Sequence, residues 1–206
     1  MREEIKNDKF TTMKDLHSIA SAFKALQMQE SLEGFFKVRE CCGAHGYSNY
    51  SNIPNIIEIW SPNVTLEGDT MVMYQQTAKG FIKIFRLIQQ YDKKAKGIYA
   101  YLNDYKDYID AREHSLEFRE SHDLLRLYRA ATILCIYKVA NMLPELDDEI
   151  NFDINWNKTH QIDIISASRL NAHYLVVSMF DEELRSRELS KPLKSVLEKL
   201  LKLYLC

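Results

Sequence analysis

Glycine and proline are scarce in this sequence, with 6 and 4 residues in a chain of 206. Tight turns and hairpins depend on these residue types, because glycine adopts left-handed backbone angles and proline restricts φ. So small a supply argues against a sheet-rich fold with many short turns. The sequence therefore predicts an all-α protein built mainly from long helices.

Long apolar runs and an excess of one charge are also missing. No run approaches the roughly 20 apolar residues that cross a bilayer, and the charged N-terminal residues lack the apolar core of a signal peptide. The formal net charge is only -2, so the chain has no overall attraction to a polyphosphate backbone. We expect a soluble protein that is not secreted, has no membrane span and does not bind nucleic acid.

Several site motifs are absent. The 4 cysteines show no Cys-x-x-Cys spacing, and the 6 histidines lack the i, i+4 pairing typical of zinc sites. G-x-S-x-G, the Walker lysine loop and a complete G-x-G-x-x-G are missing too. The sequence predicts reduced thiols and no metal site, and it gives no support to hydrolase, P-loop or Rossmann functions.

Apolar residues recur at helical spacing along most of the chain. This periodicity predicts helices over residues 16–42, 69–94, 98–109, 124–142, 170–184 and 192–204. Residues 145–157 are expected to be a connection. Residues 43–68 hold two of the prolines and three of the glycines, which predicts one long irregular stretch. Ordered loops of this length are uncommon in helical domains and are usually functional, so a site is expected here.

Glu67 lies at the end of this stretch and has two interpretations. A carboxylate just before a helix stabilises it through the helix dipole by about 0.3–1 kcal/mol, which is the more common role. Alternatively, Glu67 is a general base, and free backbone N–H groups beside it polarise a carbonyl. At the other end of the stretch, Gly43 and Gly46 would let backbone N–H groups approach a phosphate, although a plain turn is the simpler interpretation.

Two runs at the ends of the stretch carry a family resemblance. Arg39-Glu-Cys-Cys-Gly-Ala-His-Gly-Tyr-Ser48 is similar to a Cys-Gly-Gly-His-Gly-Tyr-Ser loop, and Leu66-Glu-Gly-Asp-Thr-Met-Val72 is similar to a Phe-Glu-Gly-(Glu/Asp)-Asn-Thr-Val helix start. Residues 16–25 resemble a Leu-His-x-x-x-x-x-Leu-Lys-Ala segment, and residues 163–184 resemble part of a C-terminal helical domain. At this spacing the motifs are typical of the peroxisomal acyl-CoA oxidase family, within the acyl-CoA dehydrogenase superfamily.

The resemblance implies a peroxisomal flavoprotein. Such an enzyme uses FAD to desaturate fatty acyl-CoA at the α,β bond, giving trans-2-enoyl-CoA, and passes the electrons to O2, giving H2O2, in fatty acid β-oxidation. By position, Glu67 is implied to be the base that removes the α-proton, and Gly68 is implied to border the thioester. The implied FAD contacts are Gly43, Ala44, Gly46, Asp69 and Thr70.

The sequence departs from the family pattern at both cofactor segments. Ala44 stands where the family loop has its second glycine, which is acceptable if Ala44 has a negative φ. Thr70-Met71 stands where the family has Asn-Thr, a change that affects cofactor contacts rather than the base. The last residues, Leu203-Tyr-Leu-Cys206, do not form a peroxisomal targeting tripeptide.

The resemblance also predicts the organisation of the chain. Residues 1–110 are expected to form a helical domain with the catalytic glutamate loop, of the C-terminal four-helix-bundle type, and residues 111–206 a partial second helical domain. The N-terminal helical and β-domains of the family have no counterpart here, so we expect the isolated chain to be inactive and to need a homodimer or a flavin-domain partner. Two alternatives stay open: a non-catalytic structural or interaction homologue, and a mitochondrial dehydrogenase, which the Cys-Gly-x-His-Gly-Tyr-Ser pattern disfavours.

Overall fold

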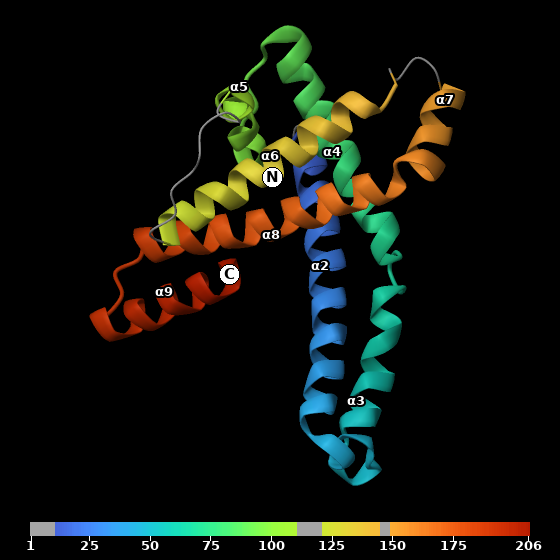
Figure 1. Ribbon diagram of the computed structural model, residues 1–206, viewed down its shortest axis with the longest axis vertical. Coiled ribbons are helices and arrows are strands. Elements are labelled where there is room, and N and C mark those ends of the chain that lie inside the picture. Colours follow the sequence, from blue (N-terminus) through green and yellow to red (C-terminus); the bar gives the residue numbers. More distant parts are fainter. Residues whose placement is uncertain (1–10, 111–120, 145–148) are drawn as a thin grey trace, which may run out of the picture. The chain divides into compact units, whose positions relative to one another are not determined.

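The computed structural model describes residues 11–110, 121–144 and 149–206. Every regular element within these ranges is a helix (Figure 1). This confirms the all-α class predicted from the scarcity of glycine and proline. Contacts divide the chain into two units, Met1–Thr77 and Ala78–Cys206, and the boundary falls within α4 (Thr70–Tyr91).

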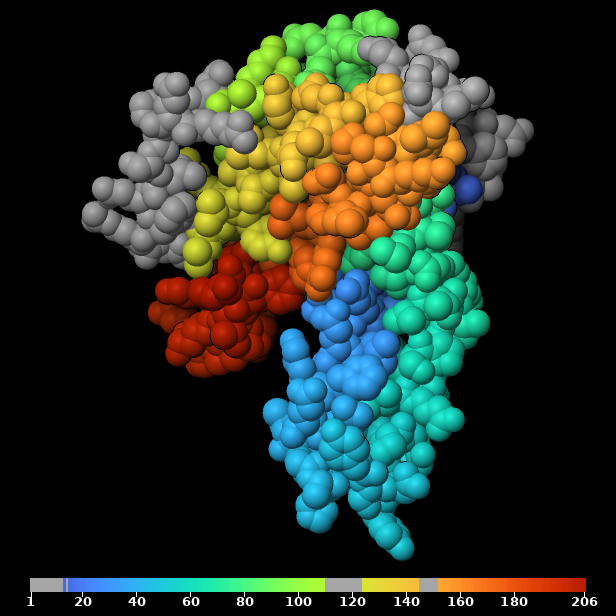
Figure 2. Space-filling model, turned by 45° about the vertical axis from the view of Figure 1, so that its right-hand side comes forward, coloured from blue at the N-terminus to red at the C-terminus, as the bar shows by residue number. Residues whose placement is uncertain are grey.

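The first described element of the first unit is one long helix, α2 (Thr11–Cys41), where the sequence predicts a helix over 16–42. The irregular stretch predicted over 43–68 was wrong for 43–64, which is mostly helical, while residues 65–68 form a turn. This stretch contains three short 3₁₀ helices and an α-helix: η1 (Gly43–Tyr47), η2 (Asn49–Ser51), α3 (Ile53–Trp60) and η3 (Ser61–Val64). α3 runs back alongside α2 in both views (Figure 1 and Figure 2).

Two features of the sequence explain why α3 forms. Asn52 adopts a left-handed conformation, with φ 62°, and reverses the chain after η2. Pro54 lies in the first turn of α3, where proline is tolerated because the N–H groups there have no partner within the helix. α3 is then held against α2 by the ring of Trp60, which meets Phe35 edge-on at 5.7 Å between centroids.

The start of α4 packs on α2 through small side chains. Ala22 and Ala25 of α2 are fully buried. Ser18 and Thr77 exchange hydrogen bonds, since each hydroxyl donates to the other residue's carbonyl oxygen at 3.3 Å. These contacts fix the first turns of α4 relative to α2, and so they position the segment that precedes α4.

Within the described residues, the second unit holds the rest of α4 and seven further helical elements. They are η4 (Gly97–Asp104), α5 (Tyr105–Asp110), α6 (Ser121–Met142), α7 (Glu149–Ile154), α8 (Gln161–Ser186) and α9 (Lys191–Leu205), with a π-helical turn, η6 (Asn155–Thr159), before α8. The helices predicted over 124–142, 170–184 and 192–204 are confirmed. The connection predicted over 145–157 was wrong for 149–157, which is helical, while 145–148 lie outside the described residues.

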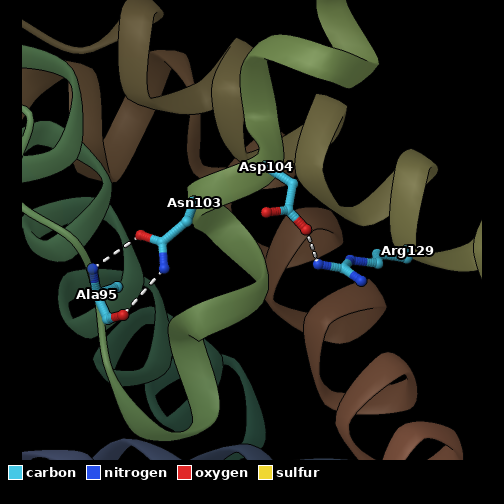
Figure 3. A network of polar contacts seen from close by, with 4 residues as sticks. All are labelled: Ala95, Asn103, Asp104 and Arg129. Atoms are coloured by element: carbon cyan, nitrogen blue, oxygen red, sulfur yellow. Dashed lines mark hydrogen bonds and ion pairs between the residues drawn. The ribbon is translucent and has the colours of Figure 1, made fainter.

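Polar side chains fasten the connections of this unit. Arg86 donates to the carbonyl oxygens of Leu143 at 2.8 Å and Pro144 at 2.9 Å, and so supplies partners that the end of α6 lacks. Asn103 pairs with both backbone groups of Ala95, accepting from its N–H at 2.8 Å and donating to its carbonyl at 3.0 Å, and Asp104 forms an ion pair with Arg129 of α6 (Figure 3).

Candidate functional site

The turn before α4 carries the predicted base. Glu67 and Gly68 follow one another with φ values of 55° and 108°. Few residues other than glycine occupy the left-handed region, and for an L-residue it costs about 1–2 kcal/mol. Glu67 is exposed and makes no hydrogen bond or ion pair with the residues that the structure describes. Its carboxylate therefore has no partner, within the described part of the chain, that accounts for its position.

Asp69, and not Glu67, caps α4. Its Oδ1 accepts the N–H of Met71 at 2.8 Å, and its carbonyl accepts the N–H of Met73 at 2.9 Å. A carboxylate that accepts the free N–H groups of a first turn is the ordinary N-cap arrangement. Asp69 thus fills the helix-stabilising role that was one interpretation of Glu67.

Two further bonds hold the turn in place. The Thr70 hydroxyl donates to the carbonyl oxygen of Val64 at 2.9 Å and so closes the turn on itself. The Lys24 ammonium, from α2, donates to the carbonyl oxygen of Gly68. Gly68 is also covered by Met73, because a Cβ at Gly68 would lie 2.5 Å from the Met73 Cε. The turn is therefore anchored at both of its ends and to α2.

The predicted phosphate turn is η1. Gly43 is exposed with a φ of 56°, and a Cβ there would meet nothing within 4 Å. Gly46 is buried, and its Cβ would lie 2.1 Å from the carbonyl oxygen of Arg39, so only glycine fits. The Arg39 guanidinium lies 4.7 Å from the ring centroid of Tyr47. Ala44 has no positive φ, so it meets the condition under which alanine is acceptable there.

The structure keeps the two predicted segments apart. Gly43, Ala44 and Gly46 lie where α2 turns towards α3, and residues 67–70 lie beyond the other end of α3 (Figure 1). α3 has 8 residues and is therefore about 12 Å long, and it separates the two segments along the chain. The sequence analysis assigns no role to Lys24 or Arg39. Both lie inside the segments that carry the family resemblance, and this location could have marked them as residues that support the site.

Other kinds of site have little support among the described residues. No cluster of three or more histidine, cysteine or acidic side chains there is able to hold a metal ion, and no described helix combines the length and apolarity required to cross a bilayer. Two pockets of about 240 and 230 Å³ lie in the second unit, beside Trp156 and between α8 and α9. Neither is lined by the predicted site residues.

Comparison with known proteins identifies the relatives of this chain. The family model described as "Acyl-CoA oxidase, C-alpha1 domain" matches residues 1–82, and the model "Acyl-CoA oxidase" matches residues 120–206. The peroxisomal acyl-coenzyme A oxidase 1 of Phascolarctos cinereus is 29% identical over 208 residues, which cover 98% of this chain and 31% of that protein.

Solved structures show the same fold. A tomato acyl-CoA oxidase superposes with a TM-score of 0.85 at 23% identity, covering 99% of this chain and 31% of that one. The acyl-CoA oxidase-1 of Caenorhabditis elegans, solved with FAD and ATP, superposes with a TM-score of 0.83 at 25% identity and covers 100% and 31%. The chain spans about a third of the length of these relatives. Because the two family models together match most of its residues, it belongs to the acyl-CoA oxidase family and corresponds to the family's all-helical C-terminal part.

Proposed function

We propose that this chain supplies the catalytic base and part of the flavin-binding surface of a peroxisomal acyl-CoA oxidase. The reaction is the FAD-dependent α,β-desaturation of a fatty acyl-CoA to trans-2-enoyl-CoA, with O2 as electron acceptor and H2O2 as the second product, in fatty acid β-oxidation. One observation carries the proposal: Glu67 is an exposed carboxylate in a left-handed turn, with no structural partner among the described residues.

The conformation of Glu67 supports a chemical role. Strained backbone angles persist only where surrounding contacts impose them, and they cluster at functional sites. Here the contacts that impose the turn come from Lys24 and Thr70, while Asp69 caps α4. The Glu67 carboxylate is thereby left available to accept the α-proton of the substrate as a general base.

The backbone around Glu67 supports the same chemistry. Among the described residues, the N–H groups of Glu67 and Gly68 have no hydrogen-bond partner. Backbone N–H groups held in place can polarise a thioester carbonyl and stabilise the negative charge that develops when the α-proton leaves. Gly68 directly follows Glu67 in the chain, so we assign it to the substrate side of the turn.

The two turns are suited to a dinucleotide cofactor. η1 presents exposed backbone at Gly43 and Ala44, with open space above Gly43, as a phosphate approaching backbone N–H groups requires. We assign Gly43, Ala44, Gly46, Asp69 and Thr70 to FAD. The Thr70 hydroxyl gives its proton to Val64, so it offers the cofactor a lone pair rather than a donor. When bound, FAD supplies the hydride acceptor and the route to O2.

A chimera tests the proposal. Residues 1–206 would replace the matching part of the C. elegans enzyme, and the purified chimera would be assayed for FAD content, enoyl-CoA and H2O2. We expect an FAD-containing protein that releases both products from acyl-CoA. A chimera that binds FAD and acyl-CoA but forms neither product would contradict the proposal and favour a non-catalytic homologue.

A further inference from the structure

Lys24 connects the Glu67 turn to a distant part of the chain. It lies in α2, 44 residues before Gly68 in sequence, and it is half-buried. Its ammonium donates to the Gly68 carbonyl oxygen. A hydrogen bond from a charged donor is roughly twice as strong as one between neutral groups. The backbone of the turn is therefore fixed from outside by a specific side chain.

The turn needs the Lys24 contact because its own hydrogen bonds are made by residues before and after Glu67 and Gly68, and not by these two residues. The N–H groups of Thr65 and Leu66 donate to the Pro62 carbonyl before it, and Asp69 and Thr70 make their bonds after it. None of these bonds involves a backbone group of Glu67 or Gly68. An L-residue with φ 55° relaxes to a more favourable angle unless its neighbours prevent it.

We propose that Lys24 is a positioning residue for Glu67. By holding the Gly68 carbonyl, it fixes the direction in which the Glu67 side chain leaves the backbone and the orientation of the adjacent N–H groups. This inference rests on the proposed function of Glu67 as the base. A misplacement of a catalytic group by 1 Å costs about 10²-fold in rate, so loss of the Lys24 bond acts on turnover more than on substrate binding.

Hydrogen exchange in the 206-residue chain tests the contact itself. The variant Lys24→Met keeps the length of the stem and removes the donor, and Lys24→Arg restores a donor. Lys37→Met is the matched control, because Lys37 is exposed on the same helix and has no polar partner among the described residues. We expect Lys24→Met to speed amide exchange of Met71 and Met73, whose N–H groups donate to Asp69 in the turn, at least about tenfold, and Lys24→Arg and Lys37→Met to leave it near the parent rate. Unchanged exchange in Lys24→Met would overturn the proposal.

Kinetics in the chimera test the consequence for catalysis. We expect Lys24→Met to lower kcat by about 10²-fold at normal FAD content and with a nearly unchanged KM for acyl-CoA, and Lys24→Arg to recover much of the loss. A variant that loses only thermal stability, with normal kcat per bound FAD, would overturn the positioning role. If Lys24→Met has a normal kcat and Glu67→Gln is inactive, the positioning role is wrong but the proposed function of Glu67 stands. If Glu67→Gln is active, the proposed function is wrong, and the hydrogen-exchange result alone decides whether Lys24 holds the turn.

Discussion

At the scale of single residues, the two turns depend on contacts that glycine alone permits. Gly46 packs on the Arg39 backbone, and the carbonyl oxygen that a Cβ would meet at 2.1 Å belongs to α2 and has little freedom to move. Gly34 offers a comparison within the same helix, because a Cβ there would meet nothing within 4 Å. The two positions therefore respond in opposite ways to the same substitution.

We predict that Gly46→Ala destabilises the chain by about 1–3 kcal/mol, because the added methyl group forces η1 away from α2. Gly34→Ala should instead stabilise it by about 0.5–1 kcal/mol, because alanine loses less backbone entropy within a helix. Denaturant unfolding followed by circular dichroism measures both changes. Equal effects of the two substitutions would contradict the close approach at Gly46.

The cysteines provide a second test at this scale. Cys41, Cys42 and Cys206 are exposed, whereas Cys135 is partly buried, and burial raises the pKa of its thiol. Because the thiolate is the reactive form, we predict that iodoacetamide modifies Cys135 more slowly than the other three at mildly alkaline pH. Mass spectrometry of peptides gives the rates. Denaturant should abolish the difference, and equally fast modification of native Cys135 would refute the prediction.

At the scale of elements, sequence periodicity predicted the long helices because each buries one continuous stripe of apolar side chains. It failed for α3, where Pro54 was interpreted as a sign of irregular structure. Pro54 lies in the first turn of that helix, where it starts a helix rather than breaking it. The left-handed Asn52 and the contact between Trp60 and Phe35 decide the outcome, and a contact across 25 residues of sequence is not visible in a local pattern.

The candidate site shows the same division between local and distant causes. The role of Asp69 is local, because it directly precedes α4 and its carboxylate accepts the N–H of Met71 two residues later. The left-handed angle of Glu67 and its support by Lys24 depend on how α2 packs beside the turn. Family resemblance identified Glu67 as the residue of interest, while its conformation came only from tertiary structure.

A buried tyrosine of η4, Tyr101, packs against α8 and makes the stability of the fold depend on pH in the alkaline range. Burial raises the pKa of Tyr101 well above its ordinary value of about 10, and its hydroxyl donates to the Asn171 side chain at 2.5 Å. Above about pH 10 the unfolded chain releases a phenolic proton that the folded chain retains. The buried Tyr101 hydroxyl therefore contributes fully to the free energy of unfolding below about pH 10. This contribution is lost as the pH rises through the folded-state pKa of Tyr101.

We predict that Tyr101→Phe weakens this alkaline loss by up to about 1.4 kcal/mol per pH unit, the value for one proton. It should also lower stability at neutral pH by about 1–3 kcal/mol, because Asn171 loses a buried partner. Tyr91→Phe is the control, since Tyr91 is exposed. Urea unfolding from pH 7 to 11 measures both effects. If the free energy of unfolding falls equally steeply with pH in Tyr101→Phe and in the parent, the predicted change in the alkaline loss is refuted.

At the scale of the whole molecule, all the flavin contacts that we propose for this chain lie in its first unit. Contacts place a unit boundary at Thr77, and the family models match residues 1–82 and 120–206, while a domain boundary near residue 110 stays a prediction. The chain spans 31% of the Phascolarctos cinereus relative, so the acyl-CoA substrate and a second flavin-binding surface stay proposals.

We predict that the 206-residue chain purifies without colour and does not oxidise acyl-CoA by itself. The backbone of η1 and the start of α4 offer few contacts, and a dinucleotide requires many to remain bound against the entropy of its release. The visible absorbance of the purified chain measures bound flavin. Stoichiometric flavin with unaided formation of enoyl-CoA would show that this chain needs no further flavin-binding surface.

The most direct test of Glu67 as the base is anaerobic mixing of the chimera with acyl-CoA, followed by flavin absorbance in a stopped-flow instrument. Glu67→Gln keeps the size of the side chain and removes the proton acceptor, and Glu58→Gln makes the same change at an exposed position on α3. We predict that Glu67→Gln retains FAD and acyl-CoA binding but reduces the flavin about 10²–10⁴-fold more slowly, while Glu58→Gln reacts like the parent. Flavin reduction by Glu67→Gln at the parent rate would contradict the assignment of Glu67 as the base.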